Sequence, residues 1–312
     1  MMRYVITGGC GFIGSHVVQL LKSKGKEVAI IDKITNRELV DQKTLLQNVQ
    51  HFYMDISDPE LMEKALLPDD IVIHLAAQSH VDVSFKNPVQ TTISNVVGIH
   101  SLLAACVKKD VKKIVIMSTD EVYGSTEQIV DVNLLNPANP YSASKAAADM
   151  IVSAYKTMHP EITITTLRSN NIAGPGQFIN NIIPRFSVLG LLKKKFTLHG
   201  DGSAMRRYLW VKDAAEAIWL LAEKATTSQI YHIGHEDKFS NLEIAEKIGN
   251  YLGLKDYISF EKDRLINDTI YPADSSDMLR DFHWQPTRNL DEFLPETIEW
   301  YREHLDHFRH RI

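Results

Sequence analysis

Short apolar runs alternate with longer amphipathic stretches along the first half of the chain. Apolar runs rich in β-branched residues predict buried strands, and stretches with a helical period between them predict helices. The predicted strands cover residues 4–7, 27–31, 51–54, 71–75 and 113–117, and the predicted helices include 13–24, 95–108 and 143–155. Strands that are apolar on both sides and alternate with helices indicate a parallel sheet covered on both faces.

The second half has a more mixed pattern. Turn signals occur at Gly174-Pro175-Gly176 and at Gly200-Asp201-Gly202. We find no internal repeat and no low-complexity linker, so composition gives no clear domain boundary. The length of 312 residues allows one large domain or two that share a core.

Composition and charge narrow the class of protein. The formal net charge is −5, which gives no basic excess to hold nucleic acid or an anionic membrane. The two cysteines, Cys10 and Cys106, fit a reducing compartment and no disulfide scaffold. We see no signal peptide, and no apolar run approaches the roughly 20 residues of a membrane span. The sequence therefore predicts a cytoplasmic protein.

A glycine cluster separates the first predicted strand from the first predicted helix. Gly8, Gly11 and Gly14 form G-x-x-G-x-x-G, and a G-x-G-x-x-G pattern starts at Gly9. Such a loop lets a pyrophosphate approach a helix N-terminus, although it can also be a simple tight turn. Asp32 ends the second strand at about the 20-residue offset at which an acid binds a ribose 2′-hydroxyl. The combination predicts NAD binding.

Two residues near Asp32 leave alternatives open. Lys33 keeps NADP in consideration, since a cation there could meet a 2′-phosphate. Asp55, just after the third strand, could meet the adenine amino group or could cap the next helix.

Tyr141 and Lys145 stand four residues apart at the start of a predicted helix, so they share one face. A free phenol has a pKa of about 10 and must fall by about three units to act as a base near neutrality. One ammonium at about 4 Å supplies a shift of that size. The pattern predicts a catalytic pair, although an exposed Tyr and Lys on a helix are common.

These residues resemble the extended short-chain dehydrogenase/reductases that act on nucleotide sugars, and most closely the nucleoside-diphosphate-glucose 4,6-dehydratases. The stretches that carry the resemblance are HLAAQSHVD at 74–82, STDEVYG at 118–124, Gly174-Pro175, and LHGDG at 198–202 leading into Arg206. The resemblance covers nearly the whole chain.

The resemblance implies an α/β fold, with a Rossmann doubly wound parallel sheet and a smaller, mostly C-terminal α/β substrate domain. It implies an NAD domain at 1–165 with a returning segment at about 207–240, and a nucleotide-sugar domain at 166–206 and 241–312. Further implied NAD contacts are Phe12, Ile13, Ile56, Leu75, Ala76 and Ala77, beside Tyr141 and Lys145.

Asp120 and Glu121 are adjacent acids at the end of a predicted buried strand. Adjacent carboxyls push their pKa values apart, which suits a reaction that needs one base and one acid. The resemblance implies that Glu121 takes the C5 proton of a hexose and that Asp120 protonates the leaving O6 hydroxyl. It also places Thr119 at the C4 oxygen beside Tyr141. The alternative is a pair of loop acids that cap a helix.

Relatives help to discriminate among reactions. Sugar 4-epimerases lack the acid pair, and UDP-glucuronate decarboxylases typically keep an acid only where Glu121 stands. C5-inverting dehydratases typically carry lysine at that position. The pair therefore favours a retaining 4,6-dehydratase. The alternatives are a 4-epimerase, a dehydratase of UDP-N-acetylglucosamine and a non-catalytic NAD-binding regulator.

The resemblance also implies the substrate contacts Ser79, His80, Asn171, Asn181, Arg206, Asn241 and Arg264. The stretch LHGDGSAMRRYLW looks more like enzymes of UDP-glucose than of dTDP-glucose. Two departures leave the sugar open. Asn180-Asn181 replaces a usual glutamate and lysine, and Thr269-Ile270 stands where an arginine is usual.

Other expectations concern partners. None of the thirteen histidines stands in a metal-ligand spacing, so no metal is predicted. Resemblance implies a homodimer through a four-helix interface built from 95–108 and 143–155. The predicted partner is otherwise a UDP- or dTDP-hexose, with no nucleic acid and no membrane.

Overall fold

The computed structural model describes residues 2–34, 45–126, 128, 131–262, 272 and 274–312. Arg264 and Thr269-Ile270 lie outside the described residues. Both cysteines are buried and free.

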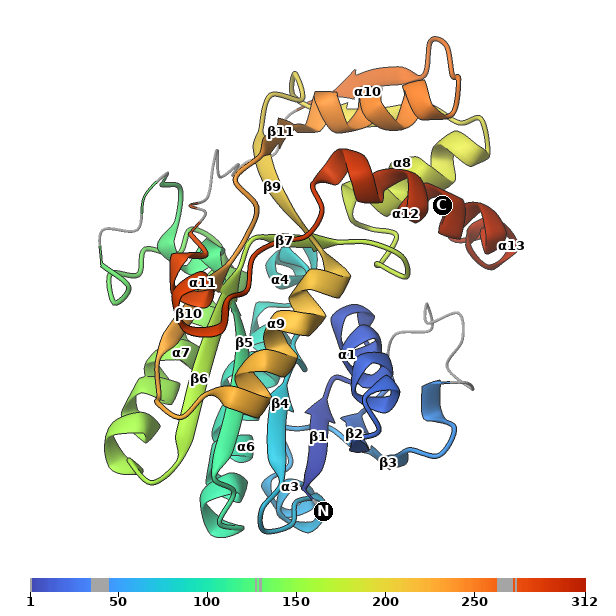
Figure 1. Cartoon of the computed structure of the whole chain (residues 1–312). Coiled ribbons are helices and arrows are strands. Elements are labelled where there is room, and N and C mark those ends of the chain that lie inside the picture. Colours follow the sequence, from blue (N-terminus) through green and yellow to red (C-terminus); the bar gives the residue numbers. More distant parts are fainter. Residues whose placement is uncertain (1, 35–44, 127, 129–130, 263–271, 273) are drawn as a thin grey trace.

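A seven-stranded sheet forms the centre of the molecule (Figure 1). Every strand pair in it is parallel. In sheet order the strands are β3 (Gln50–Tyr53), β2 (Glu27–Asp32), β1 (Arg3–Thr7), β4 (Ile71–His74), β5 (Lys113–Thr119), β6 (Thr163–Ser169) and β10 (Ile230–Ile233). The chain order reverses between β1 and β4, and ligands of such sheets bind outside the carboxyl ends of the strands at this point.

Helices cover both faces of this sheet, because its strands are apolar on both sides. Tyr4 and Ile6 of β1 pack toward α1 (Phe12–Ser23) and α9 (Val211–Lys224). Val5, between them, packs toward the opposite face. The helices on that face are α3 (Pro59–Ala65), α6 (Gly98–Lys108) and α7 (Pro140–Met158). The predicted doubly wound fold is confirmed.

Two small sheets and several helices form the remainder. The sheets are β11 (Lys238–Ser240), β9 (Met205–Trp210) and β7 (Asn171–Ala173), and the pair β12 (Ile258–Glu261) and β8 (Phe196–His199). The helices are α8 (Ile182–Leu191), α10 (Asn241–Tyr251), α11 (Ser276–Phe282), α12 (Leu290–Glu303) and α13 (Leu305–Phe308). Although α11 comes late in the chain, it packs against β10 of the large sheet. The domain division stays a prediction.

The helix predicted at 95–108 begins earlier in the structure. The stretch runs through α5 (Pro88–Thr92), the π-helical η1 (Ile93–Val97) and α6, with Pro88 in its first turn. At 21 residues it is long and apolar enough to pass as a membrane span, which corrects the expectation that no run approaches that length. Of its most apolar 18-residue window 56% is buried, and a core helix passes the same test.

Candidate active site

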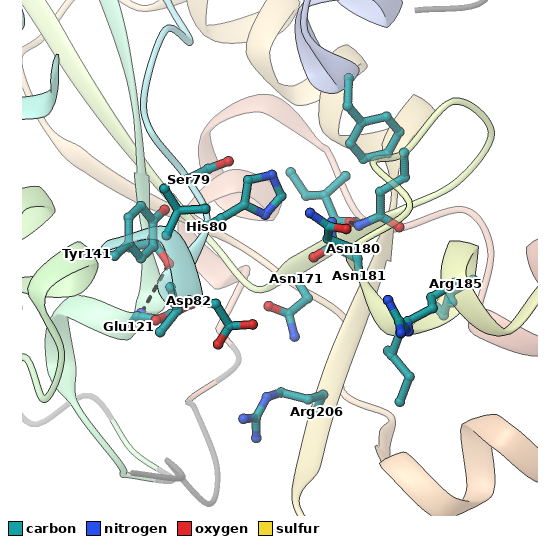
Figure 2. A pocket seen from close by; sticks show the side chains of 18 of the residues that line it. Ser79, His80, Asp82, Glu121, Tyr141, Asn171, Asn180, Asn181, Arg185 and Arg206 are labelled. Atoms are coloured by element: carbon teal, nitrogen blue, oxygen red, sulfur yellow. Dashed lines mark hydrogen bonds between the residues drawn. The ribbon is translucent and has the colours of Figure 1, made fainter. Parts of the chain in front are cut away.

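A cavity of about 890 Å³ opens at the carboxyl ends of the sheet strands. One wall comes from the large sheet and its helices, such as the end of β5 and the start of α7. The other comes from α8, β9 and α10. Figure 2 shows Tyr141 and Glu121 at one side of it, with Arg185 across from them and Arg206 below. The cavity is therefore large enough for a nucleotide sugar and carries different chemistry at its two ends.

The glycine loop has the close backbone packing that NAD binding requires. A side chain at Gly14 would put its Cβ 2.1 Å from the Gly8 carbonyl oxygen, and one at Gly8 would meet the Ala76 backbone at 2.7 Å. Gly11 is the N-cap of α1 and supplies no side-chain cap, so the first amides of that helix have no capping side chain. The loop thus fits a pyrophosphate at a helix N-terminus.

The acid at the end of β2 is held by backbone amides. Asp32 accepts hydrogen bonds from Cys10 N at 2.9 Å and from Ile34 N at 2.7 Å. Lys33 pairs with Asp55 at 2.8 Å. Asp55 also accepts from Ser57 and does not cap α3, whose N-cap is Asp58. The capping alternative for Asp55 is therefore wrong, while its adenine contact stays a prediction.

The loop after β4 forms the next part of the predicted NAD site. Thr7 Oγ1 lies 2.8 Å from His74 Nδ1 and accepts from Ala76 N at 3.3 Å, which ties this loop to β1. The predicted contacts divide into two groups. Phe12, Ile13, Leu75 and Ala77 line the cavity, whereas Gly8, Gly11, Gly14, Asp32, Asp55, Ile56 and Ala76 lie outside its lining.

The first two turns of α7 present Tyr141 and Lys145 to the cavity. Asn139 caps this helix in a capping box with Ser142, and Pro140 opens its first turn. Tyr141 N donates to Ser84 Oγ at 3.1 Å, which fixes the turn against α4 (Val81–Lys86).

The electrostatics of this pair differ from the sequence-based expectation. Lys145 Nζ donates to the Met117 carbonyl at 2.7 Å. Burial lowers the pKa of Lys145, which Asp149 partly offsets. Burial and the nearby Glu121 raise the pKa of the Tyr141 phenol above its usual value, and a hydrogen bond with Thr119 lowers it. The expected lowering by Lys145 is thus not found in this structure.

The acid pair lies at the end of β5, where the chain enters the short 3-10 helix η2 (Asp120–Tyr123). Asp120 is only 4% exposed, and burial raises its pKa from 3.8 to about 7. Glu121 lines the cavity and accepts from Asn139 Nδ2 at 3.3 Å. Thr119 lines the cavity too, and its hydroxyl lies 3.2 Å from Asp120 Oδ1. One carboxyl therefore favours its neutral form beside a second one that faces the cavity.

Most predicted substrate contacts line the cavity. Asn171 begins β7, Arg206 lies on β9 and Asn241 begins α10. The His80 ring packs against the Phe178 ring at a tilt of 44°, with ring centroids 4.4 Å apart. Ser79, His80, Asn171, Asn181, Arg206 and Asn241 are all in the lining, and Arg264 lies outside the described residues.

Among the lining residues that sequence reasoning missed, two bear most on the chemistry. Arg185 of α8 is exposed to the cavity, and its guanidinium has no hydrogen-bond or ion-pair partner among the described residues. Asn170 donates from Nδ2 to Asp120 Oδ2 at 2.6 Å. An arginine on a helix near Asn180-Asn181 could have been noticed, but nothing in the local pattern indicates the Asn170 contact.

Within the described part of the chain, no group of three or more His, Cys, Asp or Glu side chains could hold a metal ion. The polar groups around the cavity are instead carboxyls, amides, hydroxyls, imidazoles, the phenols of Tyr141 and Tyr208, and cations. These groups can move protons and bind an anionic ligand.

Comparison with known proteins places this arrangement in a family. A family model described as GDP-mannose 4,6 dehydratase matches residues 5–297. A trifunctional UDP-glucose 4,6-dehydratase, 3,5-epimerase and reductase of Arabidopsis thaliana is 36% identical over 96% of this chain. The chain spans 47% of that relative's length.

Two solved structures show the same fold. The dTDP-glucose 4,6-dehydratase DesIV of Streptomyces venezuelae, with NAD and TYD bound, superimposes with a TM-score of 0.91 at 31% identity, covering 97% of both chains. A UDP-glucose 4-epimerase of Thermotoga maritima, with UDP-glucose, gives a TM-score of 0.90 at 26% identity, covering 97% of this chain and 100% of the other.

Proposed function

The chain belongs to the GDP-mannose 4,6-dehydratase family, and we propose that it is an NAD-dependent 4,6-dehydratase of a UDP- or dTDP-hexose. The observation that carries the proposal is the acid pair at the cavity. Asp120 sits where burial keeps it neutral up to about pH 7, and the cavity-lining Glu121 and Tyr141 lie beside it. An elimination of water needs such an acid and base together.

The first step is oxidation of the C4 hydroxyl of the sugar. When bound, NAD would be held at the turn of Gly8, Gly11 and Gly14 and by Asp32, and it would supply the hydride chemistry between C4 and C6. Tyr141 acts as a phenolate that takes the C4 hydroxyl proton and becomes a phenol, and the Thr119 hydrogen bond stabilises that phenolate before the transfer. Oxidation makes C4 a ketone, so the neighbouring C5–H bond becomes acidic.

The second step is elimination across C5 and C6. Glu121 takes the C5 proton, and the electron pair of that bond forms the C5=C6 double bond; Glu121 gives the proton back to C5 when the hydrogen with its electron pair is returned to C6. The C6–O6 bond breaks, and the leaving oxygen takes the Asp120 proton and departs as water. An aspartate that stays protonated up to about pH 7 is suited to this role.

The charged end of the cavity supports a diphosphate. Arg206 and Arg185 both line it, and a guanidinium can bind two phosphate oxygens at once. Arg185 supplies a cation close to Asn181, where the sequence led us to expect a lysine. Among nucleotides we favour UDP, which is supported by the plant relative that acts on UDP-glucose.

The proposal is tested by incubating the protein and NAD with UDP-glucose and, separately, with dTDP-glucose. We expect one of them to lose one water by mass spectrometry, without net reduction of NAD. The Tyr141→Phe variant should produce no mass change while still binding NAD. No loss of water from either substrate, nor from UDP-N-acetylglucosamine, would contradict the proposal.

A 4-epimerase is the second candidate, because the Thermotoga epimerase shares the fold. Such an enzyme would convert UDP-glucose into UDP-galactose at unchanged mass. An epimerase has no use for an acid and a base at C5 and C6, so Asp120 and Glu121 weigh against this reading.

We also propose a homodimer. Val89, Ile93 and Val97 are exposed at four-residue intervals and so lie on one helix face, and the neighbouring α7 exposes Met150. An Ile93→Asp variant should sediment as a monomer while the unchanged protein sediments as a dimer. A monomeric unchanged protein would contradict this. The cytoplasmic location stays a prediction from the cysteines.

A further inference from the structure

Asn170 lies between the acid Asp120 and the chain segment that returns at Pro272. Its Nδ2 donates to Asp120 Oδ2 at 2.6 Å and to the Pro272 carbonyl at 2.7 Å. Asn170 is 5% exposed, and it lines the cavity although Asp120 does not. Asn170 therefore lies between the Oδ2 atom of Asp120 and the chain segment at Pro272.

The hydrogen bonds fix which atom of Asn170 faces the acid. A proline carbonyl can only accept, so the amide atom that it meets must be the NH2 group. A reversed amide would put its oxygen against two acceptors. The Asn170 Oδ1 atom is buried and has no partner in the described part of the chain. An unpaired buried carbonyl is costly, which is unusual for a side chain with only a packing role.

The hydrogen-bond partners of the two Asp120 oxygens also indicate which of them carries the proton. Oδ2 accepts a short hydrogen bond from the Asn170 amide group, which can only donate, whereas Oδ1 meets the Thr119 hydroxyl at 3.2 Å. That hydroxyl has one hydrogen, and when this is turned to Tyr141 its oxygen can accept from a protonated Oδ1. A neutral carboxyl has one oxygen that accepts well and one that carries the proton. The proton is thus directed to Oδ1, next to a residue that lines the cavity.

We infer that Asn170 is a positioning residue that confines the proton of Asp120 to Oδ1, from which it is delivered to the leaving hydroxyl of the substrate. This inference rests on the proposed dehydratase function. As Glu121 takes the C5 proton and the C6–O6 bond breaks, O6 takes the Oδ1 proton and leaves as water. Asp120 is left as a carboxylate whose Oδ2 still accepts from Asn170.

If Asn170 acted only through the pKa of Asp120, its loss would change the rate of proton delivery in the opposite direction. The Asn170 hydrogen bond lowers the pKa of Asp120, against the larger effect of burial. Losing that bond would keep Asp120 protonated to a higher pH, with Glu121, Tyr123 and Tyr141 as the other titratable groups near it. If Asn170 mattered only through acidity, its loss would not slow proton delivery at neutral pH.

The test compares two leaving groups in three variants. Asn170→Asp keeps the shape but can donate at most one proton, Asn170→Ala removes the amide, and Asn250→Asp makes the same change on an exposed helix position as a control. Each is given the nucleotide-glucose that the unchanged protein dehydrates, and its 6-deoxy-6-fluoro analogue. Fluoride leaves without a proton from an acid, so its loss does not need Asp120.

We expect both Asn170 variants to lose water about 10- to 100-fold more slowly, as for one hydrogen bond to a charged group. Fluoride loss and substrate KM should change little, and Asn250→Asp should match the unchanged protein. Equal slowing of water and fluoride loss would show a merely structural role, and no slowing of either would show none. Both results would overturn the inference while leaving the proposed function intact. An unchanged protein that releases neither water nor fluoride would overturn the proposed function itself.

Discussion

The acid Asp120 gives the proposal a specific pH dependence. Burial raises its pKa from 3.8 to about 7, and the charge of Glu121 adds to this. Since the acid must be protonated to act, water loss should be fast below about pH 7 and slow above it. Each pH unit above the pKa lowers the protonated fraction about tenfold, so at about pH 9 roughly 1% remains and water loss falls about 100-fold.

The assay measures water loss from the nucleotide-glucose and fluoride loss from its 6-fluoro analogue at each pH. Both reactions share C4 oxidation and C5 deprotonation, so the ratio of their rates isolates the acid. In the Asp120→Asn variant, this ratio should be low and independent of pH, because an amide cannot transfer the proton. A ratio that stays constant to about pH 9 in the unchanged protein, or that falls equally in Asp120→Asn, would refute the reasoning.

Three further predictions follow from single contacts. Glu121→Gln should lower water loss about 10²- to 10⁴-fold and stop deuterium entering C5 from heavy water, while NAD affinity measured by calorimetry stays unchanged. Deuterium entry at C5 would exclude Glu121 as the base. Arg206→Ala should raise KM about 10- to 100-fold with little change in kcat, and Arg206→Lys should raise it less; equal KM in all three proteins would remove Arg206 from the diphosphate site. Asp149→Asn leaves Arg168, otherwise paired at 2.9 Å, as a buried cation without its carboxylate. It should lower the free energy of unfolding in urea by about 3–5 kcal/mol, and Asp149→Asn with Arg168→Met should recover part of it; an unchanged value in the single variant would contradict this.

The sheet and the glycine turn could be predicted because their signals are local. Apolar runs mark the buried strands, and Gly14 is required by backbone contacts with Gly8 and Gly9 of the same turn. The helix starting at Pro88 was predicted too short, because the β-branched Thr91 and Thr92 lower the helix propensity of its first turns and the apolar face of Val89 and Ile93 is exposed rather than in the core.

The electrostatics of the site could not be predicted from spacing. Positions i and i+4 place Tyr141 and Lys145 on one helix face, but the ammonium donates to Met117, which lies 28 residues away. The pKa of the phenol depends on burial and on Glu121, which approaches it from a different element. Neither the degree of burial nor the position of Glu121 can be read from the Tyr-x-x-x-Lys pattern.

The surroundings of Asp120 could not be predicted either, because they depend on contacts between distant parts of the chain. Asn170 and Asp120 are 50 residues apart and come from the ends of β6 and β5, which are neighbouring parallel strands. The strand ends are predictable, but their register is set by pairing across the sheet. In the structure Thr119 lies opposite Ser169, so the residues that follow them, Asp120 and Asn170, lie side by side. The sequence alone does not give this register.

The central claim is that one hydrogen moves within the sugar from C4 to C6. UDP-glucose or dTDP-glucose that carries deuterium at C4 tests this directly, with the position of deuterium in the product found by NMR. The account predicts a product lighter by one water with the deuterium at C6. Deuterium retained at C4, with the galactose epimer formed at unchanged mass, would contradict it.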